Sequence, residues 1–286
     1  MAAVPTPRTA AGREGLAAIL GEPRRAVVAL DFDGTLAPIV ADPDAARAHP
    51  GAVPALSRLA PRLRAVTVIT GRPAELAVRY SGLAGAEGLD HVTVLGAYGA
   101  ERWDAATGAV RAAAPPPGVA AVRDELPALL AESAAPPGTW TEDKGRAVAV
   151  HTRRTEDPAA AFALLSGPLH ALAERHGLVV EPGRMVLELR PPGVDKGAAL
   201  TEHVRELDAG AVLYAGDDLG DLAAFEAVER LRGEGVPGLL VCSGGGDTGE
   251  RVPEIADRAD LEVDGPAGVA GLLGALADAL DDGQPG

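Results

Sequence analysis

Residues 26–35, with the sequence AVVALDFDGT, decide the fold. Residues 26–30 are wholly apolar, which is typical of a strand buried on both faces of a parallel sheet. Asp31 and Asp33 follow directly, and Gly34 ends the strand there. Because ligands bind beyond the carboxyl ends of strands in such sheets, the sequence predicts a polar site that begins at Asp31.

Further apolar runs repeat this pattern along the chain, each ending in polar residues or glycine. They are residues 65–70, 92–95, 211–215 and 239–241. Helical stretches lie between them, such as residues 74–80 and 223–231. Apolar strands alternating with helices predict an α/β core with a Rossmann-like, doubly wound parallel sheet.

The segment between residues 107 and 191 has a different pattern. Two runs within it, 147–153 and 184–190, alternate between apolar and polar side chains, which predicts strands with one buried face and one open face. A helix over 158–176 could cover the apolar side. We therefore expect an inserted α+β cap domain at 107–191, a core at 16–106 and 192–286, and a disordered N-terminal segment at 1–15.

Charge and composition narrow the classes of partner. The 286 residues include 41 acidic and 26 basic ones, a formal net charge of −15, which argues against nucleic acid or an anionic membrane surface. Cys242 is the only cysteine, which excludes internal disulfides and cysteine-cluster metal sites and fits a reducing compartment. No run approaches the roughly 20 apolar residues of a membrane span. We expect a cytoplasmic monomer that acts on a small molecule.

Acidic side chains gather at two of the predicted strand ends. Asp217, Asp218 and Asp221 follow residues 211–215, as Asp31 and Asp33 follow the first strand. Like charges repel at close range, and Mg²⁺, which prefers oxygen ligands, removes that cost while leaving room for water and phosphate. The pattern predicts a magnesium site, although acids also cap turns and helix N-termini without any metal.

Lysine is rare in this chain and its positions are informative. Lys144 and Lys196 are the only lysines among the 26 basic residues. One interpretation is that codon bias favoured arginine and two lysines remained by chance. Since lysine is a compact point charge and arginine a planar fork, we favour the other interpretation, that these two positions specifically need lysine. Lys196 precedes a predicted helix, whose N-terminus favours anions, and Thr70 offers a hydroxyl to phosphate oxygens.

These features, in order and spacing, resemble the four motifs of haloacid dehalogenase superfamily phosphatases. The motifs are residues 31–35, Thr70, Lys196, and residues 216–218 with Asp221. Within the superfamily the chain is most similar to the trehalose-6-phosphate phosphatase family, through residues 70–72, 96–101, 142–144, 151–153 and 188–197. It departs from the family pattern at Gly220 and Leu222, where Thr and Glu are usual, and at Tyr98, where many members have His.

The resemblance implies Mg²⁺-dependent hydrolysis of trehalose 6-phosphate through an aspartyl-phosphate intermediate. The implied catalytic residues are Asp31 as nucleophile, Asp33 as acid and base, Thr70 and Lys196. The implied metal residues are Asp31, Asp33, Asp217, Asp218 and Asp221. The implied substrate residues are Gly71, Arg72, Tyr98, Glu142, Lys144, Arg153, Arg184 and Glu188.

Other interpretations stay open. The substrate could be another sugar phosphate, of the sucrose or mannosyl type. The protein could also bind a sugar phosphate without hydrolysing it, although small receiver domains of that kind lack an inserted cap. The polar residues of the cap could simply face solvent and not bind a sugar. Arg184 and Glu188 could likewise pair with each other and not with a substrate.

Overall fold

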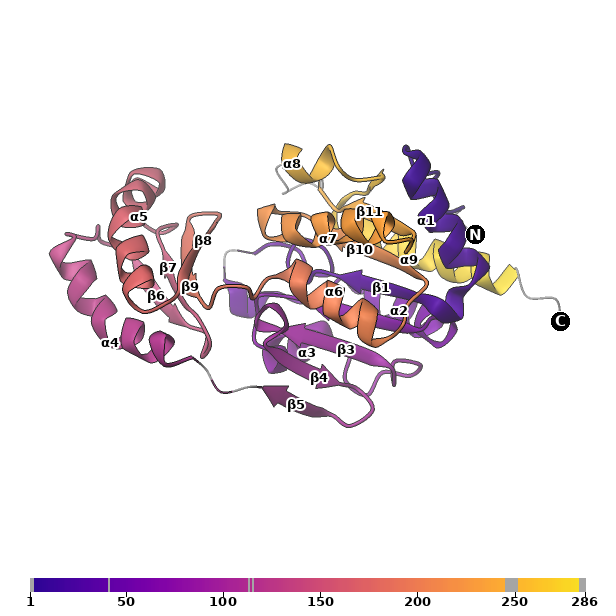
Figure 1. Cartoon of the computed structure of the whole chain (residues 1–286), viewed down its shortest axis with the longest axis horizontal. Coiled ribbons are helices and arrows are strands. Elements are labelled where there is room, and N and C mark those ends of the chain that lie inside the picture. The colour runs from indigo at the N-terminus through magenta and orange to yellow at the C-terminus, as the bar shows by residue number, and fades with distance from the viewer. Residues whose placement is uncertain (1–2, 41, 113, 115, 245–251, 283–286) are drawn as a thin grey trace. The chain divides into compact units, whose positions relative to one another are not determined.

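The computed structural model describes residues 3–282, with gaps at 41, 113, 115 and 245–251. The chain divides into two units (Figure 1). The first contains residues 1–111 and 195–286, and the second contains residues 112–194. The second unit thus spans 112–194 and not 107–191, because most of the strand at residues 109–112 belongs to the edge of the first unit's sheet.

The described part of the first unit contains an eight-stranded sheet in the order β12-β11-β10-β1-β2-β3-β4-β5. The strands from β12 to β3 are parallel, and β4 is antiparallel to β3. The chain order reverses at β1, which lies between β10 and β2, so the carboxyl ends of these three strands meet at one edge. The strands are β1 (Ala26–Leu30), β2 (Ala65–Ile69), β3 (Val92–Gly96), β4 (Glu101–Asp104), β5 (Ala109–Ala112), β10 (Ala211–Gly216), β11 (Gly238–Cys242) and β12 (Leu261–Glu262).

Helices cover both faces of this sheet because the buried strands direct apolar side chains to both sides. Val28 and Leu30 of β1 lie in one core, and Val27 and Ala29 lie in the other. The first core is closed by α1 (Ala10–Gly21), α2 (Ala52–Leu59), α3 (Ala74–Ser81) and α9 (Gly265–Asp282), and the second by α6 (Lys196–Glu206), α7 (Leu222–Gly233) and α8 (Pro253–Ala256). The predicted doubly wound α/β core is confirmed. No helix in the described ranges is both long and apolar enough to cross a membrane.

The N-terminal segment differs from the expectation of disorder over residues 1–15. Helix α1 begins at Ala10, after Thr9 accepts a hydrogen bond from the N–H of Gly12. Arg8 donates to the carbonyl of Ala259 at 2.7 Å, and Ile19 is buried in the core. The sequence gives little sign of this helix because its Ala and Gly residues form only a weak apolar stripe.

The described part of the second unit is a four-stranded antiparallel sheet in the order β6-β7-β9-β8, with two helices on one face. Val148, Val150, Leu187 and Leu189 pack against these helices, as the alternation predicts. The opposite face carries no helix of this unit and is rich in charged residues. The elements are α4 (Pro117–Glu132), β6 (Trp140–Asp143), β7 (Val148–His151), α5 (Pro158–Arg175), β8 (Val179–Gly183) and β9 (Val186–Arg190).

Candidate active site

A cluster of three carboxylates lies where β1 and β10 end. Among the described residues, Asp31, Asp217 and Asp221 each offer an oxygen within 4.8 Å of the other two. Asp31 directly follows β1, and its N–H donates to the carbonyl of Ala215 in β10 at 2.9 Å. The strand pairing therefore fixes the distance between these acids, as expected for parallel strands that end at the same edge.

Lys196 is the cation of this cluster. Its Nζ lies 2.8 Å from Asp31 Oδ1 and 2.7 Å from Asp221 Oδ1. It is the first residue of α6, which begins after Asp195 accepts from the N–H of Ala198. Burial by itself would lower the pKa of Lys196, but the carboxylates of Asp221 and Asp31 outweigh it, so the pKa lies well above the usual value. The ammonium is therefore charged at neutral pH.

Asp221 uses both oxygens to organise its neighbours. Oδ1 also accepts from the hydroxyl of Tyr214 at 2.6 Å, and Oδ2 accepts from the N–H groups of Asp217 and Asp218 at 3.0 and 3.2 Å. With both oxygens engaged, Asp221 holds Lys196 and the backbone beside Asp217 in place. Tyr214 contacts the site although the motifs do not include it. The sequence signal that could have pointed to it is a tyrosine in a buried strand, because a buried phenol hydroxyl requires a hydrogen-bond partner.

Asp31 and Asp217 carry charge that this one lysine does not balance. Burial raises the pKa of Asp31 well above its usual value, and the carboxylates of Asp221 and Asp218 add to this against the opposing effect of Lys196. The pKa of Asp217 is likewise raised, first by burial and then by the carboxylates of Asp221 and Asp31. A buried carboxylate pair with raised pKa values lacks a counter-charge.

The residues present fit a divalent cation. Asp217 Oδ1 is buried and accepts no hydrogen bond from any described residue. On its other side, Gly34 has a φ of 80° and approaches so closely that a Cβ there would lie 2.0 Å from Asp217 Oδ2. Carboxylate oxygens are the ligands that Mg²⁺ prefers, and an oxygen that accepts no hydrogen bond is free to bind the ion. Asp31 and Asp217 could therefore hold such an ion.

The other two predicted metal residues lie outside this cluster. Asp218 Oδ1 accepts from the N–H of Gly220 at 2.9 Å, where it caps the 3₁₀ turn Leu219–Asp221. Asp33 forms two hydrogen bonds with Arg72, from Nε to Oδ2 and from Nη2 to Oδ1, both at 2.7 Å. The sequence could not predict this pair, since it depends on how the loops after β1 and β2 face each other.

The remaining predicted residues of the first unit gather after β2. Thr70 is buried, and its hydroxyl accepts from the N–H of Arg72 at 3.1 Å. Tyr98 donates its N–H to the carbonyl of Thr70 at 2.9 Å, and its hydroxyl lies so close to Gly71 that a Cβ there would be 2.7 Å away. Residues 70–72 and 98 thus form one compact group.

In the second unit, three predicted substrate residues share the open sheet face. Glu142 lies opposite Ala149 in the ladder, and Ala149 lies opposite Glu188. Lys144 forms an ion pair with Glu188, whose Oε1 is buried and has no hydrogen-bond partner among the described residues. Arg190 and Glu181 continue this polar face with an ion pair of 2.6 Å, and sequence reasoning did not assign a role to either.

Arg153 and Arg184 lie elsewhere in the second unit. The alternation predicts strands over 147–153 and 184–190, but β7 ends at His151 and β9 begins at Val186. Arg153 donates to the carbonyl of Arg184 at 3.0 Å, at the opposite end of β9 from Lys144. Arg184 lies in the turn before β9, where Met185 has a φ of 54° that alternation cannot reveal.

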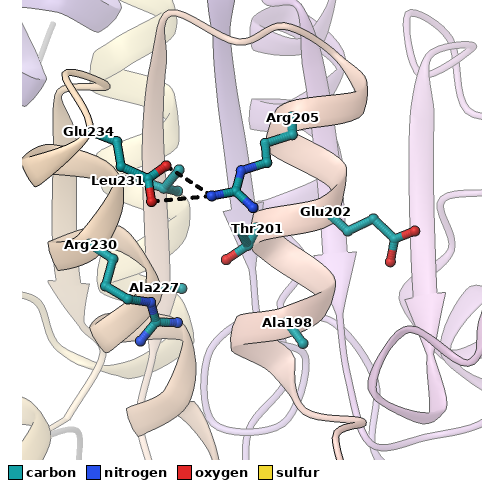
Figure 2. Close-up of a pocket in the computed structure, with 8 residues that line it drawn as sticks. All are labelled: Ala198, Thr201, Glu202, Arg205, Ala227, Arg230, Leu231 and Glu234. Carbon is teal, nitrogen blue, oxygen red and sulfur yellow. Dashed lines mark hydrogen bonds and ion pairs between the residues drawn. The ribbon is translucent and has the colours of Figure 1, made fainter.

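A separate pocket lies between α6 and α7 (Figure 2). Its lining includes Thr201, Arg205 and Arg230, and an ion pair of 3.0 Å joins Arg205 to Glu234 across it. None of the predicted site residues lines it.

Solved structures share this architecture. A haloacid dehalogenase-like hydrolase from Bacteroides thetaiotaomicron superposes with a TM-score of 0.57 at 17% identity, covering 87% of this chain and 98% of that one. The C-terminal domain of trehalose-6-phosphate phosphatase from Candida albicans gives a TM-score of 0.70 at 21% identity, covering 97% and 99%. The fold is therefore that of the haloacid dehalogenase-like hydrolases.

The sequence comparison is more specific. Residues 29–250 match the family model described as trehalose-phosphatase. A trehalose-phosphate phosphatase from Mycolicibacterium paratuberculosis is 37% identical over 96% of this chain, and the chain spans 66% of that relative's length. The chain belongs to the trehalose-phosphatase family.

Proposed function

We propose that this protein is a Mg²⁺-dependent phosphatase that hydrolyses trehalose 6-phosphate to trehalose and phosphate. The observation that carries the proposal is the cluster of Asp31, Lys196 and Asp217, in which one buried carboxylate oxygen of Asp217 has no hydrogen-bond partner among the described residues. Family membership and the printed names of the relatives support the substrate.

The reaction proceeds in two displacements. The Asp31 carboxylate attacks phosphorus and the bond from phosphorus to the sugar oxygen breaks, which leaves an aspartyl phosphate. Asp33 gives a proton to the departing oxygen and later takes one from the water that attacks the intermediate. That second attack releases phosphate and restores Asp31.

Charge stabilisation comes from fixed groups. Lys196 already lies 2.8 Å from the attacking carboxylate, and Thr70 offers its hydroxyl from the neighbouring strand end. Both can bind the equatorial oxygens of the phosphoryl group, where negative charge is distributed during transfer. Asp31 and Asp217 would hold Mg²⁺, which would add positive charge beside the phosphoryl group.

For the sugar, we assign hydroxyl binding to the open sheet face of the second unit. Glu188 has a buried oxygen without a hydrogen-bond partner among the described residues, and Glu142 and Lys144 lie on the same face, which therefore carries both acceptor and donor groups. A phosphatase for another sugar phosphate is the second candidate, favoured by the departures at Gly220, Leu222 and Tyr98.

We also propose that the protein works as a monomer in the cytoplasm.

A phosphate-release assay tests the proposal. Trehalose 6-phosphate should be turned over at least about tenfold faster than sucrose 6-phosphate or a mannosyl phosphate, only with Mg²⁺ present and not after addition of EDTA. Asp208→Asn is a suitable control for Asp31 variants, because Asp208 is exposed and its φ of 48° suits asparagine. Faster phosphate release from another sugar phosphate would reject trehalose 6-phosphate as the substrate. If no sugar phosphate in the panel released phosphate, the proposal of hydrolysis would be rejected.

A further inference from the structure

Ser243 joins two segments that are distant in sequence. It follows β11 and is 3% exposed, and its N–H donates to the carbonyl of Gly216 at 2.9 Å. Its hydroxyl donates to the carbonyl of Gly34 at 3.0 Å and lies 2.9 Å from the hydroxyl of Thr35. The Ser243 hydroxyl also lies 3.4 Å from the carbonyl of Gly216. Because these two carbonyls can only accept, we assign the single proton of Ser243 to them and Thr35 as the donor in the hydrogen bond between the hydroxyls.

These contacts begin where the backbone ladder ends. The pairing of β1 with β10 stops at Leu30 and Ala215, apart from the bond from the Asp31 N–H to Ala215. Beyond that point Gly34 lies in the loop after β1, while Gly216 is the last residue of β10 and pairs with Cys242 of β11. Ser243 contacts the carbonyls of both, so its side chain and N–H continue the connection that the ladder no longer makes.

The ends of β1 and β10, and the residues directly after them, carry the cluster's carboxylates. Gly34 follows Asp31 by three residues and presses against the carboxylate of Asp217, while Gly216 immediately precedes Asp217. A shift of Gly34 or Gly216 changes the spacing of the carboxylates of Asp31 and Asp217. Octahedral Mg²⁺ sites demand near-ideal oxygen positions, so such a shift weakens binding.

We infer that Ser243 is a positioning residue that sets the affinity of the Asp31–Asp217 site for a divalent cation. In the described part of the chain its hydrogen bonds go to Thr35, Gly34 and Gly216 and to neither carboxylate, so it acts through Gly34 and Gly216. The inference rests on the proposed function only in taking these two acids as the magnesium site.

Calorimetric titration of the full chain with Mg²⁺, without substrate, tests this inference. Ser243→Ala should raise the dissociation constant about 10- to 100-fold, the usual effect of losing a residue that orients metal ligands. Ser81→Ala is the matched control: Ser81 is also 3% exposed and donates to a backbone carbonyl, that of Val78, at 3.0 Å. Its dissociation constant should stay at the wild-type value, even if its melting temperature falls as much as that of Ser243→Ala.

Three outcomes would overturn the inference: wild-type affinity in Ser243→Ala, an equal loss in Ser81→Ala, or no binding of Mg²⁺ by the wild type. If Ser243→Ala does not fold, Thr35→Val removes the hydroxyl that donates to Ser243, and it should still weaken binding; unchanged affinity would then decide against the inference. A wild type that binds Mg²⁺ but hydrolyses no sugar phosphate would reject the proposed function and leave the role of Ser243 standing.

Discussion

Replacing Lys196 with methionine should destabilise the first unit strongly. The substitution keeps much of the side-chain volume and removes the ammonium that lies 2.8 Å from Asp31 and 2.7 Å from Asp221. At an effective dielectric constant of about 20, each contact corresponds to about 6 kcal/mol of attraction, much of it offset by desolvation of the ions. Measured losses for breaking buried pairs are about 3–5 kcal/mol, and we expect a loss in this range.

Urea unfolding without metal at neutral pH measures this loss. The chain has two tryptophans, Trp103 in β4 of the first unit and Trp140 in the second, so a Trp140→Phe background makes fluorescence report the first unit alone. At about 2–4 °C per kcal/mol, the melting temperature should fall by roughly 6–20 °C.

Arg205→Met is the matched control for this substitution. Arg205 lies on the same helix and pairs with Glu234, but both side chains are at least half exposed. Such pairs contribute about 0–1 kcal/mol, so its unfolding free energy should barely change. A Lys196→Met variant as stable as Arg205→Met would refute the claim that Lys196 neutralises buried carboxylates.

Two further predictions concern the same cluster. Asp217→Asn should stabilise the metal-free protein at neutral pH, because the raised pKa of Asp217 means that folding penalises its charged form. This gain in unfolding free energy should shrink as pH falls through the folded-state pKa and vanish below the unfolded value of 3.8. The variant should also lose any rise in melting temperature that Mg²⁺ causes in the wild type. Melting curves across pH with and without Mg²⁺ test this, and a gain that persists at pH 3 would contradict it. Tyr214→Phe removes the buried hydrogen bond of 2.6 Å to Asp221 and should cost about 1–3 kcal/mol in urea unfolding, whereas an unchanged midpoint would show that the hydroxyl is not needed to hold Asp221.

Much of the core could be predicted because its signals are local. The strands β1, β2, β3, β10 and β11 are buried at every position, so continuous apolar runs mark them. Parallel strand ends meet at one edge, which brings Asp31 and Asp217 together without knowledge of side-chain geometry. The scarcity of lysine pointed to Lys196, which lies between two of the acids.

The parts that could not be predicted depend on tertiary geometry. The pairing of Asp33 with Arg72 requires the relative placement of two loops. The double engagement of Asp221 requires the turn after β10 to fold back onto Tyr214 of the same strand. Alternation extended the strands of the second unit too far, since period-two patterning continues into the turn at Arg184. Helix α1 was missed because alanine and glycine give little periodic contrast.

The central claim is that Asp31 receives the phosphoryl group. Enzyme mixed with trehalose 6-phosphate and Mg²⁺, quenched in acid within one turnover, should show a mass increase of one phosphoryl group on the peptide that contains Asp31. Asp31→Asn should show neither the adduct nor phosphate release, while Asp208→Asn should show both. A phosphoryl group on another peptide, or full turnover by Asp31→Asn, would contradict the account.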